Sequence, residues 1–263
     1  MTELKATVRR WLRWDDAAEP AGRAARAVRR YLRWNNDWYG SHALRYLPVV
    51  RALRRAGARR VLEVGSGDRG VAPFLGAPVV AVDLDFDAEG LRRAGPLVVP
   101  VRARIHALPF ARAAFDAVLA IDVLEHLPPA ARAPAMRELG RVASRLVVVA
   151  VPCGTRAARM EARLDRVHLR RFGIANSWLA EHRQHGLPEA TDIARMLGAA
   201  LPDGRLTVLG NAPLPLWYAL EALDVAIPRN YARRILTGGL VRLASHWNTR
   251  LAYRHIFIVE RQP

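Results

Sequence analysis

The sequence predicts an α/β fold in which a largely parallel sheet carries helices on both faces. The first observation is an apolar run at residues 61–64, followed by a loop with three glycines that ends at Gly70. The second is another apolar run, at residues 78–82, that ends in Asp83. The third is the continued alternation of short apolar runs with helix-period segments up to residue 152. Strands that alternate with helices in this way form parallel sheets covered on both faces.

The remaining elements follow in chain order. After the first two strands, further strands are expected at residues 97–101, 115–121, 146–151, 205–209 and 255–260. Helices are expected at residues 71–75, 87–93, 130–143, 156–171, 177–185 and 189–201. Ligands of such sheets bind at the carboxyl ends of the strands. That edge is predicted to hold Gly65, Asp83, Ile105, Asp122 and Pro152.

The N-terminal part is predicted to be a helical extension, residues 1–56, that precedes a main domain at residues 57–263. Three helices are expected in it, the last at residues 43–53. The first two carry arginines opposite an apolar face and have tryptophans nearby. We interpret them as surface helices that cover one end of the core, with peripheral membrane contact as the alternative.

Composition narrows the protein class. The chain has 263 residues, a formal net charge of +17 and one cysteine, Cys153, so an internal disulfide is excluded. The charge would favour a nucleic-acid partner, but Lys5 is the only lysine in an arginine- and alanine-rich chain. Such a bias is typical of GC-rich coding sequences, and we expect no nucleic-acid partner. No apolar run reaches the length of a membrane span, and the prediction is a cytoplasmic protein. The oligomeric state is left open.

The glycine loop indicates a ligand with a ribose. Gly65 and Gly67 allow the backbone to turn tightly and to approach a ligand closely. Asp83 lies 20 residues after Glu63, a spacing that brings a carboxylate of the second strand to a ribose bound over the first. Taken alone, this pattern also fits a nicotinamide-dependent oxidoreductase.

Four motifs, in this order, resemble the class I S-adenosylmethionine-dependent methyltransferases, close to the methyltransferase type 11 and ubiquinone-pathway group. They are Glu63-Val64-Gly65-Ser66-Gly67, Val82-Asp83, Ala107-Leu108-Pro109-Phe110 with Phe115-Asp116-Ala117-Val118, and Asp122-Val123-Leu124-Glu125-His126-Leu127. The resemblance implies a Rossmann-like sheet of seven strands in the order 3-2-1-4-5-7-6, with the last strand antiparallel. It also implies S-adenosylmethionine as the cofactor.

The resemblance assigns cofactor contacts residue by residue. They are Glu63, Gly65, Ser66, Gly67, Asp83, Leu84, Arg104, Ile105 and Asp122. One position departs from the family pattern, because Arg104 stands where relatives carry an acid for the adenine amino group. The Ile105 amide or stacking by Arg104 could replace that contact.

Two clusters are candidates for the chemistry. Asp122 and His126 are catalytic candidates in the first, and the similar place in ubiquinone-type enzymes implies a magnesium site of Asp122, Glu125 and His126 as an alternative. We expect no metal there, because the same residues fit a helix start. His182 and His185, three residues apart on one predicted helix, form the second cluster, either as a base or as a helix cap.

The expected function is methyl transfer to a hydroxyl or carboxyl group of a metabolite, lipid precursor or saccharide. Insertions at about residues 153–204 and 211–252 are predicted to cap the ligand edge, because they are long and rich in Trp, Tyr and Leu. Together with the N-terminal helices they should enclose a pocket that His182 or His185 faces. The alternatives are an RNA-directed methyltransferase, a nicotinamide-dependent oxidoreductase and a cofactor-binding protein that has lost the reaction.

Overall fold

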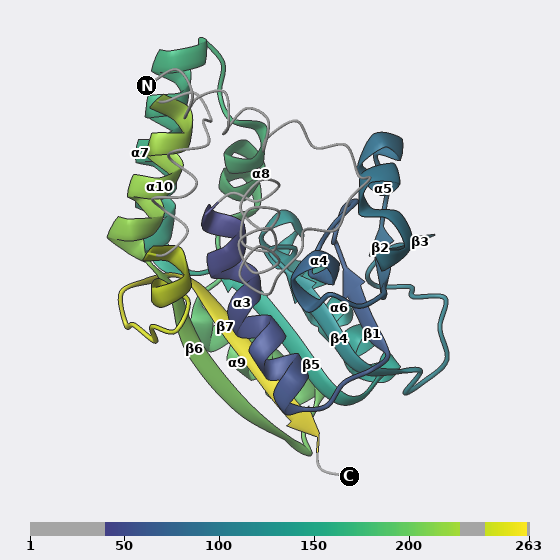
Figure 1. Ribbon diagram of the computed structural model, residues 1–263. Coiled ribbons are helices and arrows are strands. Elements are labelled where there is room, and N and C mark those ends of the chain that lie inside the picture. The colour runs from purple at the N-terminus through teal and green to yellow at the C-terminus, as the bar shows by residue number, and fades with distance from the viewer. Residues whose placement is uncertain (1–39, 227–239, 262–263) are drawn as a thin grey trace. The chain divides into compact units, whose positions relative to one another are not determined.

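The computed structural model describes residues 40–226 and 240–261, which contain one seven-stranded sheet (Figure 1). Its spatial order is β3-β2-β1-β4-β5-β7-β6. The strands are β1 Val61–Val64, β2 Val79–Asp83, β3 Val98–Arg102, β4 Phe115–Ile121, β5 Ala143–Pro152, β6 Gly204–Pro213 and β7 Ala252–Arg261. The order implied by the resemblance is therefore confirmed.

Strand direction also agrees with the prediction. The pairs from β3 through β5 are all parallel, as in the register Glu63↔Leu119 between β1 and β4. β7 is antiparallel to both of its neighbours, with Ile258 facing Val148 on β5 and Thr207 on β6. The alternation of apolar runs predicted the parallel part, because strands buried on both faces read as continuous apolar stretches.

Helices cover both faces of the sheet (Figure 1). α3 (Gly40–Arg55) lies against β5 and β6 on one face, and α6 (Pro129–Val142) and α9 (Ala190–Ala200) pack together on the other. The remaining short helices of the cofactor half are α4 (Ala72–Leu75), α5 (Ala88–Ala94) and the 3-10 turns η1 (Gly95–Leu97) and η2 (Leu124–His126). The two helices predicted before α3 lie outside the described residues.

Three helices gather at the carboxyl end of the sheet, at the top of Figure 1. They are α7 (Gly154–Phe172), α8 (Ser177–His185) and α10 (Leu214–Ala226). α7 packs along α10, and α8 packs on η2. α9 lies within the first predicted insertion, but its Ile193 and Leu197 are fully buried in the main core. Of that insertion, only α7 and α8 lie at the carboxyl end of the sheet.

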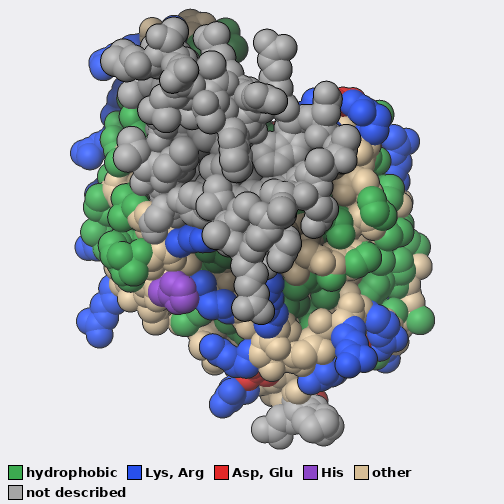
Figure 2. All heavy atoms as spheres, in the orientation of Figure 1, with side chains coloured by type: hydrophobic (Ala, Val, Ile, Leu, Met, Phe, Trp, Pro, Cys, Tyr) green, Lys and Arg blue, Asp and Glu red, His purple; other side chains and the backbone are tan. Residues whose placement is uncertain are grey.

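On the face shown in Figure 2, arginine side chains lie around the periphery, with apolar side chains between them. Within the described residues, no helix is both long and apolar enough to cross a lipid bilayer.

Candidate active site

A buried carboxylate on β1 holds the glycine loop from the interior of the protein. Glu63, 1% exposed, accepts a hydrogen bond of 2.6 Å from the Val71 amide at the far end of the loop. A Cβ on Gly70 would stand 2.1 Å from the same carboxylate, which explains the third glycine. Burial raises the pKa of Glu63 to about 7, although the Val71 amide opposes that shift. In the described residues, Glu63 supports the loop from inside the protein.

The first two glycines serve different purposes. Both have positive φ, +74° at Gly65 and +56° at Gly67, which favours glycine. A Cβ on Gly65 would lie 2.3 Å from Val123, so this glycine allows the loop to pack on the segment after β4. A Cβ on Gly67 would meet no atom of the described residues within 4 Å. Among these residues the backbone at Gly67 is therefore open, as expected for the side that receives a ligand.

Asp83 links the two loops at this edge. Its carboxylate accepts from the Gly67 amide at 2.8 Å and from the Leu84 amide at 2.7 Å. Two hydrogen bonds leave a carboxylate with further acceptor capacity. Leu84 is 66% exposed, and the Ser66 hydroxyl donates to the Gly67 carbonyl. Asp83 therefore keeps acceptor capacity at the glycine loop, where the sequence predicts a ribose.

The segment expected at the adenine forms a tight turn. The Ala107 amide donates to the Arg104 carbonyl, while the Arg104 side chain is exposed and Ile105 is buried. An exposed guanidinium beside a buried aliphatic side chain is compatible with the stacking role that the sequence suggested for Arg104.

Asp122 follows β4 with a φ of +53° and is enclosed by two arginines. Arg254, from β7, donates to both carboxylate oxygens at 2.5 Å, and Arg45, from α3, lies at 2.9 Å. Burial alone would raise the pKa of Asp122, but the two guanidinium groups outweigh it and hold the pKa below the usual value. Asp122 thus remains ionised and paired, which suits a structural anchor better than a proton acceptor.

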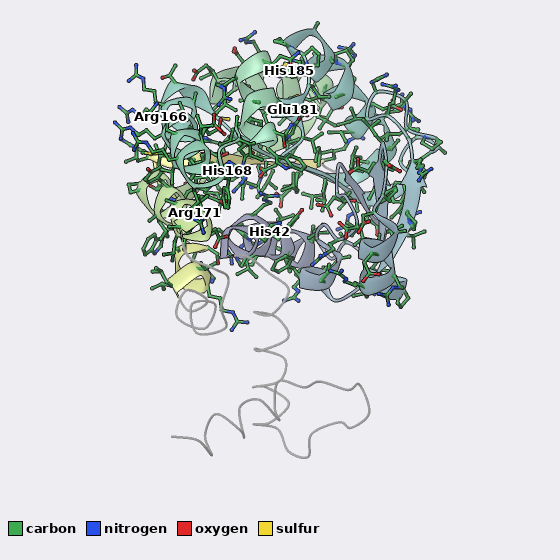
Figure 3. The ribbon with its side chains drawn as sticks, turned by 90° about the horizontal axis from the view of Figure 1, so that it is seen from above. His42, Arg166, His168, Arg171, Glu181 and His185 are labelled. Atoms are coloured by element: carbon green, nitrogen blue, oxygen red, sulfur yellow. The ribbon has the colours of Figure 1, made fainter. Side chains whose placement is uncertain are left out.

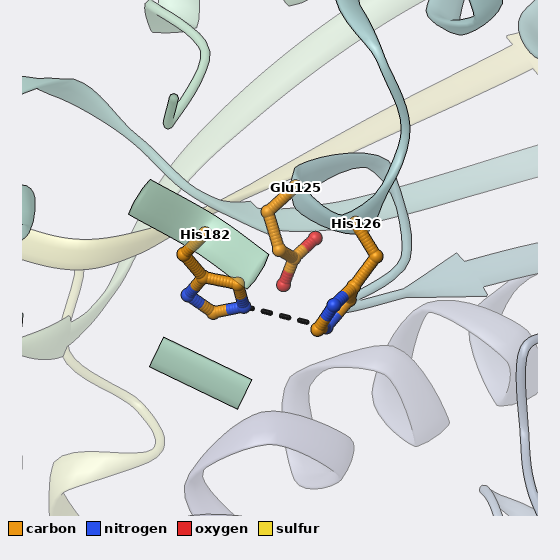
Figure 4. A group of neighbouring side chains, drawn as sticks. All are labelled: Glu125, His126 and His182. Atoms are coloured by element: carbon orange, nitrogen blue, oxygen red, sulfur yellow. Dashed lines mark hydrogen bonds between the residues drawn. The ribbon is translucent and has the colours of Figure 1, made fainter. Parts of the chain in front are cut away.

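The loop after β4 and helix α8 bring two imidazoles together (Figure 4). Nε2 of His126 lies 3.3 Å from Nε2 of His182. The opposite nitrogen of each ring faces a carboxylate: Nδ1 of His126 lies 2.6 Å from Glu181, and Nδ1 of His182 lies 2.9 Å from Glu161. The hydroxyl of Tyr253 also donates to Glu161, at 2.7 Å.

Glu125 completes this cluster. Its side chain is fully buried, and neither carboxylate oxygen is hydrogen-bonded to another described residue. One oxygen of Glu125 and one ring nitrogen each of His126 and His182 lie within 4.8 Å of one another. Burial, and then the charge of Asp122, raises the pKa of Glu125 well above the usual value. Burial and the neighbouring His182 lower the pKa of His126, against the effect of Glu181.

The structure separates the two histidines of α8. His182 joins the cluster, whereas His185 lies one turn further along the helix (Figure 3), where its carbonyl accepts from Arg132. Sequence reasoning missed five partners of the cluster and of Asp122. They are Arg45, Glu161, Glu181, Tyr253 and Arg254. The Glu181-His182 dipeptide was a signal for one of them, since the helix between Ser177 and His185 was predicted.

The comparisons with known proteins agree on the domain type. Residues 62–149 match the family model described as a methyltransferase domain. No curated protein matches the chain.

Solved structures share the fold at low identity. One is the magnesium protoporphyrin IX methyltransferase of Synechocystis PCC 6803 with bound SAH (TM-score 0.54, 16% identity, 98% of this chain and 95% of that one). Another is a possible histamine N-methyltransferase of Thermotoga maritima (TM-score 0.52, 15% identity, 90% of this chain and 97% of that one). A third is the phosphoethanolamine N-methyltransferase 2 of Haemonchus contortus with S-adenosyl-L-methionine (TM-score 0.51, 17% identity, 81% of this chain and 52% of that one).

Proposed function

We propose that this chain methylates an oxygen of a small molecule bound beside Glu125, His126 and His182, with S-adenosylmethionine as the methyl donor. The methyltransferase-domain match over residues 62–149 and the shared fold of solved methyltransferase structures support this proposal. The acceptor class is a hydroxyl- or carboxyl-bearing metabolite, lipid precursor or saccharide. The three structural relatives are named for different acceptors, so this proposal rests on the residues of this chain.

One observation carries the proposal: the polar cluster is joined to the cofactor loop. Gly65 is in close contact with Val123, and Glu125 and His126 follow in the same loop. In methyl transfer the acceptor must lie in line with the sulfonium methyl group, and such positioning is worth up to about 7–11 kcal/mol. A polar cluster that adjoins the cofactor loop is therefore suited to hold the acceptor.

The burial of the cluster favours a small acceptor group over a polymer backbone. Glu125 is 0% exposed and His182 is 6% exposed, so any group that reaches them must enter a narrow, desolvated place. A nucleic-acid track would instead need a continuous path of exposed basic groups. Oxygen is the favoured target, because a buried set of imidazoles and a carboxylate can take up or replace the proton of a hydroxyl.

The rim of the cluster supports a partly apolar acceptor. Trp178 of α8 is 66% exposed, and its ring centroid lies 5.4 Å from that of His126. Exposed indole beside a polar site provides an apolar surface for an acceptor and an edge for hydrogen bonding. The acceptor class should therefore combine an apolar body with a hydroxyl or carboxyl group.

Labelled S-adenosylmethionine tests this function when the enzyme is incubated with separate metabolite, lipid and RNA extracts. We expect label in a small molecule. Glu125→Gln should abolish this transfer while calorimetry still shows cofactor binding, because Glu125 lies on the acceptor side. Label that appears only in RNA, with an affinity that falls steeply with salt, would contradict the proposal.

A further inference from the structure

The two histidines of the cluster are held in one orientation by carboxylates. A carboxylate accepts hydrogen bonds and does not donate them, so Nδ1 of His126 must carry a proton toward Glu181. The same holds for Nδ1 of His182 toward Glu161, whose position is fixed by the Tyr253 hydroxyl. A neutral imidazole with a proton on Nδ1 presents a lone pair on Nε2.

The two lone pairs therefore point into the same small space. The Nε2 atoms are 3.3 Å apart, and two neutral acceptors at this distance repel unless a proton or a metal ion lies between them. Two imidazole nitrogens that bind one zinc ion at about 2.0–2.1 Å in tetrahedral geometry are about 3.3–3.4 Å apart. The observed distance matches that arrangement.

Glu125 supplies the third donor. Its carboxylate is completely buried, is hydrogen-bonded to no other described residue and points into the same space (Figure 4). A buried polar group without a partner costs about 1–3 kcal/mol, and more for a charged one. A bound cation would remove that cost. The buried carboxylate is an observation independent of the histidine geometry.

We propose that Glu125, His126 and His182 form a binding site for one divalent transition-metal ion of the zinc type. Two imidazoles and one carboxylate are a common donor set for such ions and leave positions open for water or substrate. Mg²⁺ prefers a shell of oxygen ligands, so a site with two nitrogen donors favours zinc or cobalt over magnesium.

The ligand set differs from the sequence-based alternative of Asp122, Glu125 and His126. Arg254 and Arg45 already occupy the carboxylate of Asp122, so this residue stays outside the set. His182 takes its place from α8, 56 residues after His126. Glu161 and Glu181 orient the ligands, an arrangement typical of histidines that bind metals.

The site rests on the proposed function for its chemical role. A metal held there would supply a lowered pKa to a bound acceptor hydroxyl, as zinc does for bound water. The hydroxyl would give its proton to water, and its oxygen would form a bond to the methyl carbon of S-adenosylmethionine as the carbon–sulfur bond breaks and S-adenosylhomocysteine leaves.

Metal binding is measured without turnover. The full chain is treated with a chelator, dialysed and titrated with Co²⁺, Zn²⁺ or Mg²⁺, with cobalt absorption in the visible range and elemental analysis as readouts. We expect one Co²⁺ or Zn²⁺ per chain and at least a hundredfold weaker binding of Mg²⁺. His126→Ala, His182→Ala and Glu125→Gln should each weaken Co²⁺ binding at least a hundredfold. Glu161→Gln should weaken it about 10- to 100-fold, because this residue orients His182.

The matched control is His185→Ala, which removes a histidine from the same helix and should leave Co²⁺ binding unchanged. Binding of S-adenosylmethionine by calorimetry shows that each variant is folded. A chain that binds S-adenosylmethionine but no Co²⁺ or Zn²⁺ would overturn the metal site and leave the proposed function intact. Equal losses in His182→Ala and His185→Ala would overturn it as well.

Discussion

The cofactor side and the acceptor side of this molecule are built in different ways. On the cofactor side, Glu63, Gly67 and Asp83 act within 20 residues of one another, through contacts to backbone amides. On the acceptor side, contacts between side chains join distant parts of the chain, as in Arg254 with Asp122, which are 132 residues apart. The cofactor side is therefore built from contacts that are local in the sequence, whereas the acceptor side depends on the completed fold.

The largest effect should come from the buried arginine of the acceptor side. Arg254→Leu leaves Asp122 buried with only Arg45 as a partner, and removal of one member of a buried ion pair costs about 3–5 kcal/mol. Denaturant unfolding should show a loss of stability of that size. Arg205→Leu is the control. Its pair with Glu260 joins β6 to β7, and because Arg205 is 76% exposed the pair is worth about 0–1 kcal/mol. Equal losses in the two variants would contradict the proposed role of Arg254 as a buried anchor.

The same contrast explains what the sequence could predict. Glycine spacing, strand periodicity and the acid at the end of β2 are local patterns, and they predicted the strands and put Asp83 beside the glycine loop, where it accepts from Gly67. The order of the strands was implied by the family resemblance instead. Periodicity also predicted α8 at the bounds that it has, Ser177–His185.

Long-range pairs were beyond such patterns. Nothing in the local sequence of Tyr253 or Arg254 indicates that one supports Glu161 and the other anchors Asp122. Helical spacing put His182 and His185 on one face, and only the packing of α8 on η2 separates them. Such patterns could not place α9 either, because its apolar face fits a core helix as well as a lid.

Gly65→Ala would test the junction between the two sides. An alanine at this position must keep the positive φ of Gly65, which costs about 1–2 kcal/mol. Its Cβ also overlaps the Val123 side chain, which costs about 1–3 kcal/mol more. We expect a stability loss of about 2–5 kcal/mol together with weaker cofactor binding. Gly76→Ala is matched for φ, at +72°, but its Cβ would meet no described atom within 4 Å, so only the first cost should appear. Identical melting curves for the two variants would show that the overlap with Val123 does not lower the stability.

Glu63 makes the stability of the cofactor side depend on pH. Its folded pKa, about 7, lies above the unfolded value of 4.5, so the native state binds a proton that the unfolded state has lost between these values. The contribution of Glu63 is fully present below pH 4.5 and is lost as pH rises through 7, by up to about 3 kcal/mol. Denaturant unfolding of the wild type and of Glu63→Gln at pH 5 and pH 8 isolates the contribution of Glu63 to the free energy of unfolding. The wild type should lose more stability than the variant, and parallel changes would refute the assignment.

Asp83→Ala should give the smallest effect and separates affinity from chemistry. The carboxylate connects Gly67 and Leu84 and faces the place predicted for the ribose, where each charge-assisted hydrogen bond is worth about 1.5–3 kcal/mol. Loss of one such bond weakens S-adenosylmethionine binding about tenfold or more, since about 1.4 kcal/mol corresponds to tenfold. At saturating cofactor the turnover should change little, because Glu125, His126 and His182 are untouched.

Asp85→Ala, in the exposed segment two residues later, is the control and should bind S-adenosylmethionine like the wild type. Calorimetry gives the affinity and single-turnover kinetics the chemical step. A fall in the chemical step with unchanged affinity would mean that Asp83 serves the acceptor side, and the division between the two sides would fail.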